Sequence, residues 1–256
     1  MLYLDNKKTI EFNDTNFWSQ ESEFWNKYGK IYRHLEAATP YKRMLNDIFE
    51  VLTNTNHDIW LDAGCGPGTM IDFLIRKNIK YKSIIGLDFD GVMVDQAAKR
   101  LSHLENISIG TADLSKQLEY EDGHFDGIIA NLVFSYVIIF NGKYVGKDAL
   151  VKVLSEMYRL LNDNGTLLWT TPVDNVNFKK VFLASWRQTM NPLKPYIFYG
   201  PKVLSYALKI QDKGKRGIYH FLSYEEIYKI MQDIGFKNIL IKKTFANQAY
   251  LISANK

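Results

Sequence analysis

The segment Asp62-Ala63-Gly64-Cys65-Gly66-Pro67-Gly68 is the part of the sequence best suited to hold a ligand. It follows a short apolar run and precedes a run with helical spacing, so we expect it to form the turn between a strand and a helix. Glycines let such a turn bend sharply and let the backbone approach a ligand where a Cβ atom would collide. A tight turn without a ligand would show the same glycines, so neighbouring residues must decide between the two interpretations.

Two carboxylates, Asp88 and Asp113, follow the next two apolar runs. Acids at strand ends commonly cap the next helix. At the ligand-binding edge of an open sheet, however, Asp88 could accept both hydroxyls of a ribose and Asp113 could accept an exocyclic amine. Asp62 suits a cationic amino group better than a pyrophosphate. Thr69 stands where a dinucleotide-binding loop would require its third glycine, which disfavours a nicotinamide or flavin cofactor.

A parallel sheet would bring these residues together, and the order of expected elements supplies one. Short apolar runs alternate with helical stretches, which is typical of a parallel sheet with helices on both faces. The expected strands are residues 58–62, 83–87, 106–109, 125–130 and 166–171, and the expected helices between them are residues 69–77, 91–104 and 148–161. Before residue 60 we expect only helices, residues 21–35 and 41–52, the second starting at Thr39-Pro40.

The chain after residue 172 follows a different pattern. A helix begins with a capping box at Ser223 and Glu226. The two strands that follow, residues 238–243 and 248–253, are too close in sequence for a parallel crossover, so they must be antiparallel. Residues 173–221 are rich in aromatic side chains, and we expect them to form a helical insertion packed over the carboxyl edge of the sheet.

The expected fold is α/β: a doubly wound, mostly parallel seven-stranded sheet with an antiparallel last strand, an N-terminal helical lid and an inserted helical segment after the fifth strand. We expect a single domain over residues 1–256. Its expected parts are N-terminal helices (1–55), a cofactor-binding core (56–172), a substrate-side insertion (173–221) and a C-terminal helix with a strand pair (222–256).

The composition is that of an ordinary globular protein. The 256 residues are 46% hydrophobic and 23% charged, which argues against disorder and against a disulfide scaffold. The single cysteine, Cys65, points to a reducing compartment. The net charge of +4, from 32 basic and 28 acidic residues, is too small to indicate nucleic acid by itself. The N-terminus lacks the apolar core of a signal peptide, and the stretch 128–140 is too short to cross a bilayer, so we expect a cytoplasmic protein with no transmembrane segment.

Several stretches together resemble the class I (Rossmann-like) S-adenosylmethionine-dependent methyltransferases, in particular the small-molecule subgroup that includes the quinone-type enzymes. They are LDAGCGPG at 61–68, Asp88, Ala112-Asp113-Leu114 and EDGHFDGIIANLVFSYV at 121–137. Residues 24–32 also resemble the lid helix of that family. The resemblance covers residues 20–172 well and the insertion poorly, and it names no substrate.

The resemblance implies S-adenosylmethionine as the cofactor. The residues that it implies for binding are Asp62, Gly64, Cys65, Gly66, Gly68, Asp88, Phe89, Met93, Asp113, Leu114 and Asn131. In that arrangement the glycine turn holds the methionine and ribose, Asp88 accepts the ribose hydroxyls and Asp113 accepts the adenine amine. Phe89, Met93 and Leu114 lie beside the adenine. Asn131 contacts the methionine amino group through its backbone carbonyl.

Methyl transfer by direct displacement needs no protein nucleophile, because holding the reactants in line can supply ~7–11 kcal/mol. A general base is needed only when the acceptor arrives protonated. The candidates to face the acceptor are Tyr28 and Tyr32 on the expected lid helix, Tyr136 after the fourth strand, and His220 at the end of the insertion. An aromatic stripe at i, i+4 spacing and local capping are their ordinary structural alternatives. The sequence shows no metal-ligand cluster.

These observations predict a methyltransferase that acts on oxygen, nitrogen or carbon of a small, partly apolar molecule. A non-catalytic, S-adenosylmethionine-binding regulatory or scaffold protein would carry the same turn and acids and stays an alternative. An RNA methyltransferase is a less favoured one, since the lysines of the insertion are interleaved with aromatics. A solvated basic face over an apolar one would look the same. The oligomeric state is left open.

Overall fold

The computed structural model describes residues 2–4, 8–10, 15–32, 35–36, 38–53, 55, 57–185 and 196–256. Its centre is a seven-stranded sheet with the strand order β10-β11-β9-β6-β3-β4-β5. The strands are β3 (Ile59–Ala63), β4 (Ser83–Asp88), β5 (Ile107–Thr111), β6 (Phe125–Asn131), β9 (Leu161–Pro172), β10 (Lys237–Thr244) and β11 (Ala249–Asn255). Within this sheet β11 runs antiparallel to both of its neighbours, and the other pairs are parallel. The predicted fold class is confirmed.

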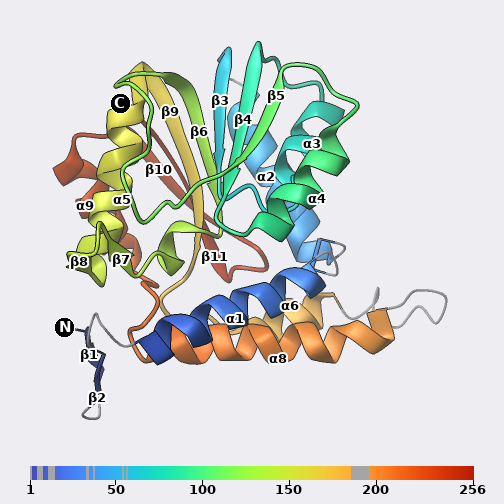
Figure 1. The fold of residues 1–256 in the computed structure, drawn as a ribbon, viewed down its shortest axis with the longest axis vertical. Coiled ribbons are helices and arrows are strands. Elements are labelled where there is room, and N and C mark those ends of the chain that lie inside the picture. The colour runs from blue at the N-terminus through green and yellow to red at the C-terminus, as the bar shows by residue number, and fades with distance from the viewer. Residues whose placement is uncertain are drawn as a thin grey trace.

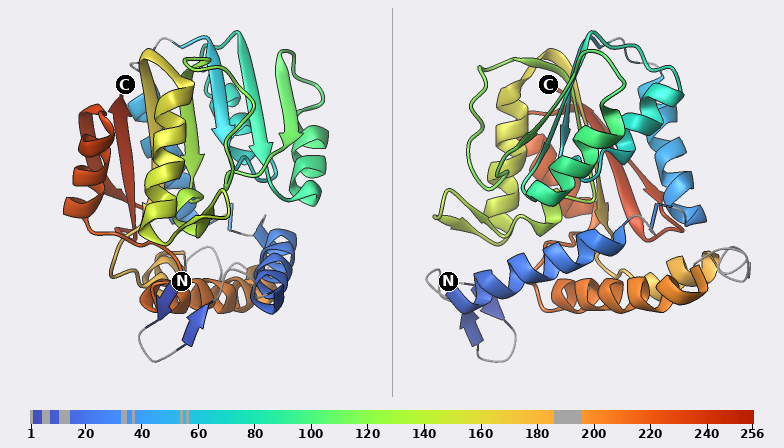
Figure 2. Two further views of the ribbon diagram at one scale, coloured as in Figure 1. Left: turned by 60° about the vertical axis from the view of Figure 1, so that its left-hand side comes forward. Right: turned by 45° about the vertical axis from the view of Figure 1, so that its right-hand side comes forward.

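Helices cover both faces of the sheet. They are α2 (Thr39–Leu52), α3 (Thr69–Arg76), α4 (Gly91–Leu101), α5 (Lys147–Leu160) and α9 (Tyr224–Ile234). Helix α3 packs against both α2 and α4, and α5 packs against α9. Figure 2 shows α5 and α2 on opposite faces of the sheet. The capping box of α9 is present, with Ser223 and Glu226 each accepting a hydrogen bond from the other's backbone N–H.

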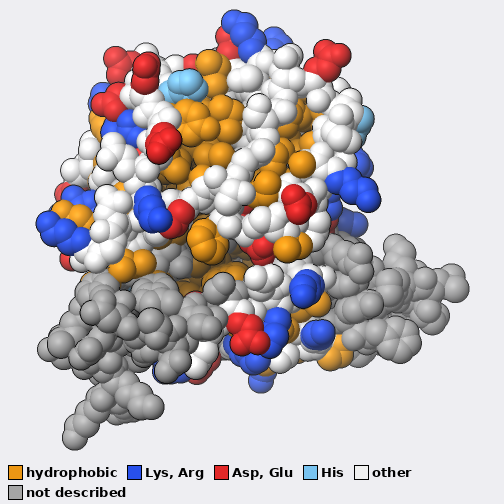
Figure 3. Space-filling view, viewed as in Figure 1, with side chains coloured by type: hydrophobic (Ala, Val, Ile, Leu, Met, Phe, Trp, Pro, Cys, Tyr) orange, Lys and Arg blue, Asp and Glu red, His pale blue; other side chains and the backbone are white. Residues whose placement is uncertain are grey.

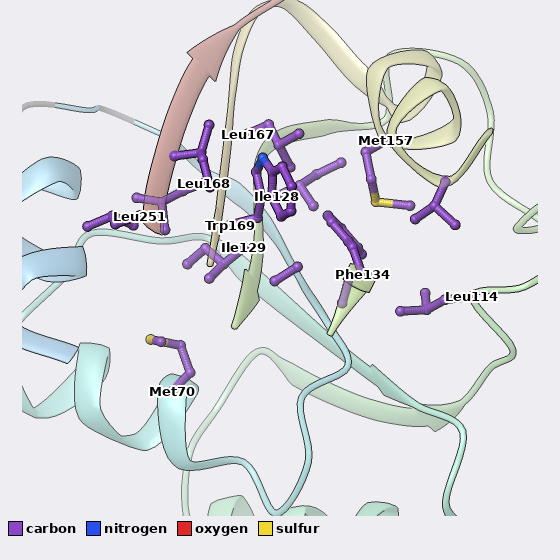
Figure 4. Packing of buried hydrophobic residues seen from close by; sticks show 14 of the residues in the cluster. Met70, Leu114, Ile128, Ile129, Phe134, Met157, Leu167, Leu168, Trp169 and Leu251 are labelled. Atoms are coloured by element: carbon purple, nitrogen blue, oxygen red, sulfur yellow. The ribbon is translucent and has the colours of Figure 1, made fainter. Parts of the chain in front are cut away.

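The core lies between the sheet and these helices (Figure 4). Trp169 of β9 is 1% exposed and its ring lies 5.8 Å from that of Phe134, with interplanar tilt of 43°. Ile128 of β6 and Met157 of α5 complete this part of the core. Strands buried on both faces must be continuously apolar, which is why short apolar runs predicted them correctly.

Helices α1 (Thr15–Tyr32), α6 (Phe178–Ala184) and α8 (Tyr196–Lys215) form a layer at the carboxyl ends of the parallel strands (Figure 1). Helix α8 packs against both α1 and α6. The insertion is therefore helical and covers the carboxyl edge, as predicted. The division of the chain into four parts stays a prediction. No helix within the described ranges combines the length and apolar character needed to span a membrane.

Two short hairpins were not predicted. The first joins β1 (Leu2–Leu4) to β2 (Lys8–Ile10), so the expectation of helices alone before residue 60 is wrong. Tyr, Thr and Ile in these segments favour strands, and each segment is too short for a helical period to show. The second hairpin joins β7 (Ile139–Phe140) to β8 (Tyr144–Val145). Residues 162–165, between the expected helix (148–161) and the expected strand (166–171), lie inside β9, where its register against β6 shifts.

Candidate functional site

The glycine turn joins β3 to α3 and is fixed by the end of β4. Gly64, Gly66 and Gly68 have φ values of 79°, 53° and 75°, which an L side chain rarely adopts. The backbone N–H groups of Gly64 and Cys65 both donate to the carbonyl oxygen of Leu87, at 2.7 and 2.9 Å. A Cβ atom at Gly64 would overlap the side chain of Val133, whereas one at Gly66 would meet nothing within 4 Å. Open space therefore lies beside Gly66.

Asp88 holds the turn from the neighbouring strand. Its carboxylate accepts hydrogen bonds from the backbone N–H groups of Gly66, at 2.8 Å, and of Asp90, at 2.9 Å. Burial raises the pKa of Asp88, and the two backbone donors act against that rise. A carboxylate has about four lone-pair positions, so Asp88 keeps acceptor capacity for hydroxyl groups.

Asp62 is a buried carboxyl group with an unsatisfied oxygen. Its side chain is 3% exposed, and Oδ2 has no hydrogen-bond partner among the described residues. Burial raises the pKa of Asp62 to about 8, and the nearby charge of Asp88 adds to the rise. An unpaired buried polar atom is costly, so it marks a place where a donor is expected. A cationic amino group would supply one.

Cys65 lies inside the glycine turn but does not take part in chemistry. Its side chain is 5% exposed, and burial, with smaller contributions from Asp62 and Asp88, raises the pKa of its thiol. The thiol therefore stays protonated, and nucleophilicity belongs to the thiolate. A buried, protonated thiol in this turn contributes packing.

The residues expected beside the adenine lie at the same edge of the sheet. Phe89 is 66% exposed, whereas Met93 and Leu114 are buried. The Asp113 carboxylate accepts from the backbone N–H of Ser115 at 2.9 Å and lies 3.4 Å from the ammonium of Lys116. Asp113 therefore does what an ordinary capping acid does, with oxygen positions to spare.

Met93 contacts the lid helix instead of open space. A Cβ atom at Gly29 of α1 would overlap the Met93 methyl group, the far end of a flexible side chain, so α1 and α4 approach each other closely at this point.

Asn131 ends β6, and its side chain is occupied by the protein. Its Nδ2 donates to the Tyr41 hydroxyl at 3.2 Å, and its Oδ1 accepts from the Thr170 hydroxyl at 2.7 Å. The same Thr170 oxygen accepts from the backbone N–H of Leu132, a residue with a φ of 56°. The side-chain amide of Asn131 is therefore engaged within the protein, and the backbone contact that the resemblance implies stays a prediction.

Aromatic rings from three segments meet above the carboxyl edge. Trp25 of α1 lies 5.0 Å from the ring of Tyr136, and the Tyr136 ring lies 5.0 Å from that of Tyr219. Tyr28 lies 5.8 Å from the rings of both Trp25 and Tyr206. Burial raises the pKa of Tyr28 and of Tyr136, so both hydroxyls stay protonated near neutral pH. The sequence brought Tyr28 and Tyr136 forward separately, and the fold places them in one aromatic cluster.

A buried ion pair joins the lid helix to the insertion. The Lys213 ammonium of α8 pairs with Glu21 of α1, and the Tyr219 hydroxyl donates to the other Glu21 oxygen at 2.8 Å. Lys213 also lies 4.2 Å from the centre of the Phe24 ring. This pair could not be predicted from local sequence patterns, because its members are 192 positions apart.

His220 follows the insertion and is 6% exposed. Its backbone N–H donates to the carbonyl oxygen of Ser135 at 3.0 Å, which ties it to the loop after β6. Its Nε2 is buried without a hydrogen-bond partner among the described residues. Burial lowers the pKa of His220 to about 4, so the ring is neutral near pH 7.

Tyr32, one of the candidates to face the acceptor, is not tested by the structure. The side chain of Tyr32, the last residue of α1, lies outside the described part of the structure. Thr69 does not face a ligand, since its hydroxyl bonds to Glu36 and accepts from Arg100 at 2.5 Å. Among the described residues, no group of three or more His, Cys, Asp or Glu side chains could hold a metal ion.

Comparison with known proteins places this site in a class. Residues 61–165 match the family described as a methyltransferase domain. Together with the fold, this match relates these residues to the class I S-adenosylmethionine-dependent methyltransferase domains, a class whose cofactor is S-adenosylmethionine.

Individual relatives are more distant. A malonyl-[acyl-carrier protein] O-methyltransferase of Legionella pneumophila is 32% identical over 111 residues, covering 43% of this chain and 35% of that protein. A demethylmenaquinone methyltransferase of Lactobacillus johnsonii is 27% identical over 191 residues, covering 73% of this chain and 70% of that protein. The N-methyltransferase NodS of Bradyrhizobium japonicum, solved with S-adenosyl-L-homocysteine, has a TM-score of 0.59 at 13% identity, over 90% of this chain and 98% of that one. The chain spans 35% to 44% of the length of the first three curated relatives that it matches.

The residues present fit the cofactor of this class. Asp62 offers an unsatisfied buried oxygen to an ammonium group, and the space beside Gly66 admits a ligand next to the backbone. Asp88 can accept hydroxyl groups, and the exposed ring of Phe89 offers an apolar surface to a purine.

Proposed function

We propose that this chain transfers a methyl group from S-adenosylmethionine to oxygen, nitrogen or carbon of a small, partly apolar molecule, by in-line displacement. The observation that carries the proposal is the buried, unsatisfied oxygen of Asp62 beside Asp88 and the open space at Gly66. When bound, the cofactor supplies an electrophilic methyl group on a sulfonium. Asp62 would bind its ammonium group, Asp88 its ribose hydroxyls and Asp113 its adenine amine.

The acceptor side follows from the aromatic cluster and His220. The rings of Trp25, Tyr28 and Tyr136 would exclude water above the carboxyl edge and contact an apolar acceptor. His220 is neutral, and its buried Nε2 would take the proton of an acceptor hydroxyl or ammonium group. The demethylmenaquinone methyltransferase that the chain resembles supports an apolar acceptor.

Cofactor binding is tested by calorimetry with S-adenosylhomocysteine. Asp88→Ala is expected to weaken binding by ~1–3 kcal/mol, because it leaves ligand hydroxyls unpaired. Asp95→Ala is the matched control, since Asp95 is an exposed acid on the same helix, α4, that Asp88 precedes. An unchanged dissociation constant in Asp88→Ala would remove Asp88 from the site.

Catalysis is tested with S-adenosylmethionine labelled in its methyl group. The protein is incubated with a panel of phenols, aromatic amines and hydrophilic amines, and labelled products are identified by mass spectrometry. Transfer to aromatic acceptors alone supports the proposal, and equal transfer to hydrophilic amines contradicts the apolar assignment. Tight cofactor binding with no transfer to any acceptor, including those of a cell extract, would favour a regulatory or scaffold protein instead.

A further inference from the structure

The positive charge of this protein is concentrated in one segment. Residues 173–221 contain nine Lys and Arg against two Asp and Glu, a net charge of +7. The whole chain carries +4, so the remaining residues carry −3. A balanced total therefore conceals a basic segment on an acidic body, and such asymmetry points to an anionic partner.

The described lysines of this segment form an exposed face. We call the basic face the set Lys179, Lys180 and Leu183 of α6 with Lys202, Lys209 and Lys215 of α8; all six residues are exposed. On α8 the exposed positions 202, 205, 209 and 212 recur every three or four residues, which is one side of a helix. Positions 203, 207 and 214, on the opposite side, are partly buried.

The lysines of the basic face are free of acidic partners within the described residues. Of the cations of this segment, Lys213 is paired with Glu21 inside the protein and Arg216 lies 3.6 Å from Asp212. None of the five lysines of the basic face forms an ion pair with a described acid. Leu183, which follows Lys179 and Lys180 on α6, is 65% exposed. Unpaired lysines around an exposed apolar side chain suit a surface that is anionic and also accepts hydrocarbon.

Helices α6 and α8, which we call the base helices, form a surface that suits a flat partner. Helices α6 and α8 pack side by side across the carboxyl ends of the strands, in one layer at the base of the molecule (Figures 1 and 2). Figure 3 shows Lys and Arg side chains along the described part of this lower edge. Helices that lie in one plane, with lysines outward, can rest on a membrane surface.

Other anionic macromolecules fit the basic face less well. Single-stranded RNA is held by exposed aromatic rings that stack on its bases. The described aromatics Tyr206, Tyr219 and Phe221 lie instead in or beside the aromatic cluster, and no described aromatic of the insertion is among the strongly exposed residues. An acidic protein surface is bound best by arginine side chains, whose guanidinium groups form paired hydrogen bonds with carboxylates. The basic face carries dispersed lysines instead.

We propose that the basic face binds the surface of an anionic lipid bilayer. This inference rests on the proposed function and adds a source for the acceptor. The base helices cover the carboxyl edge of the sheet, so this edge would lie next to the bilayer. The acceptor would then be a molecule dissolved in the membrane. Lysines would contact lipid phosphates, and Leu183 would enter the hydrocarbon boundary.

Co-sedimentation of the full chain with vesicles tests the inference. One set of vesicles is phosphatidylcholine alone and the other is phosphatidylcholine mixed with phosphatidylglycerol. We expect binding to the mixed vesicles only, and its loss at high ionic strength. Replacing three lysines, in Lys179→Glu/Lys180→Glu/Lys202→Glu, should lower the partition coefficient roughly 100-fold.

A matched triple variant separates the face from net charge. Lys80→Glu/Lys99→Glu/Lys237→Glu makes the same charge change at exposed lysines away from the base helices and should bind as the wild type does. Equal losses in the two triple variants, or equal binding to neutral vesicles, would overturn the inference. The inference would also be overturned if the protein did not bind vesicles but bound polyglutamate or single-stranded RNA in a salt-sensitive way. Calorimetry with S-adenosylhomocysteine on the same samples keeps this failure distinct from failure of the proposed function.

Discussion

The carboxyl group of Asp62 makes the stability of the ligand-free protein depend on pH in a defined direction. Burial first, and the charge of Asp88 second, raise its pKa from 3.8 to about 8. The folded state therefore holds a proton that the unfolded state has lost. For a group whose pKa is raised by folding, the stabilisation is fully present below the unfolded pKa and is lost as pH rises through the folded pKa.

The effect of Asp62 on stability can be measured separately from that of His220 between pH 6.5 and pH 8. Below this range, His220 acts in the opposite direction, because its lowered pKa of about 4 makes stability increase with pH up to the ordinary histidine value of 6.5. Between pH 6.5 and pH 8, protonation of Asp62 contributes progressively less to the free energy of unfolding. With a folded pKa of about 8, the free energy of unfolding should fall by roughly 1.5 kcal/mol.

Urea unfolding of the ligand-free protein at several pH values in this range measures that fall. Asp62→Asn removes the titrating group and keeps its shape, so its unfolding free energy should be nearly independent of pH there. Asp95→Asn, at an exposed position on α4, should behave as the wild type does. A slope that survives in Asp62→Asn would refute the assignment of the titration to Asp62.

Three further predictions concern the cofactor turn and the base helices. S-adenosylhomocysteine should bind several-fold more tightly at pH 8 than at pH 6.5, because Asp62 must lose its proton to receive an ammonium; calorimetry should show proton release, and its absence would contradict the contact. Gly64→Ala should destabilise the fold by more than ~2 kcal/mol because of overlap and positive φ, whereas Gly66→Ala should fold with a cost nearer ~1 kcal/mol and lose ligand affinity. Lys213→Met should lower the unfolding free energy by ~3 kcal/mol by leaving Glu21 buried without its cation, and adding Glu21→Gln should recover part of that loss; equal stability of the single and double variants would show that the pair is unimportant.

The cofactor side of the site could be predicted from the sequence because its signals are local. Each glycine and acid follows an apolar strand, and parallel strands with right-handed crossovers end at one edge of the sheet. Asp62, Asp88 and Asp113 were therefore placed together by topology alone. The functional assignment of each residue stays a prediction, although the open space at Gly66 and the unsatisfied oxygen of Asp62 agree with it.

The acceptor side could not be predicted in the same way, because it is made by contacts between distant segments. Tyr136 meets Trp25 and Tyr219 only after the insertion has folded back over α1. A buried threonine in β9 is a signal that the sequence does contain. Thr170 is a buried hydroxyl residue of β9, and a buried hydroxyl needs partners, which here are Asn131 and the backbone of Leu132.

The charge balance of the carboxyl edge also depends on distant residues. A sequence shows which acids reach the edge but not which cations accompany them. In the described structure, Arg100 is occupied by Glu36 and Lys213 by Glu21, and no described cation forms an ion pair with Asp62. The fold therefore keeps a buried acid without its countercharge, at a cost to its own stability. A cationic ligand removes that cost on binding, so an unfavourable feature of the ligand-free protein becomes part of the affinity for the ligand.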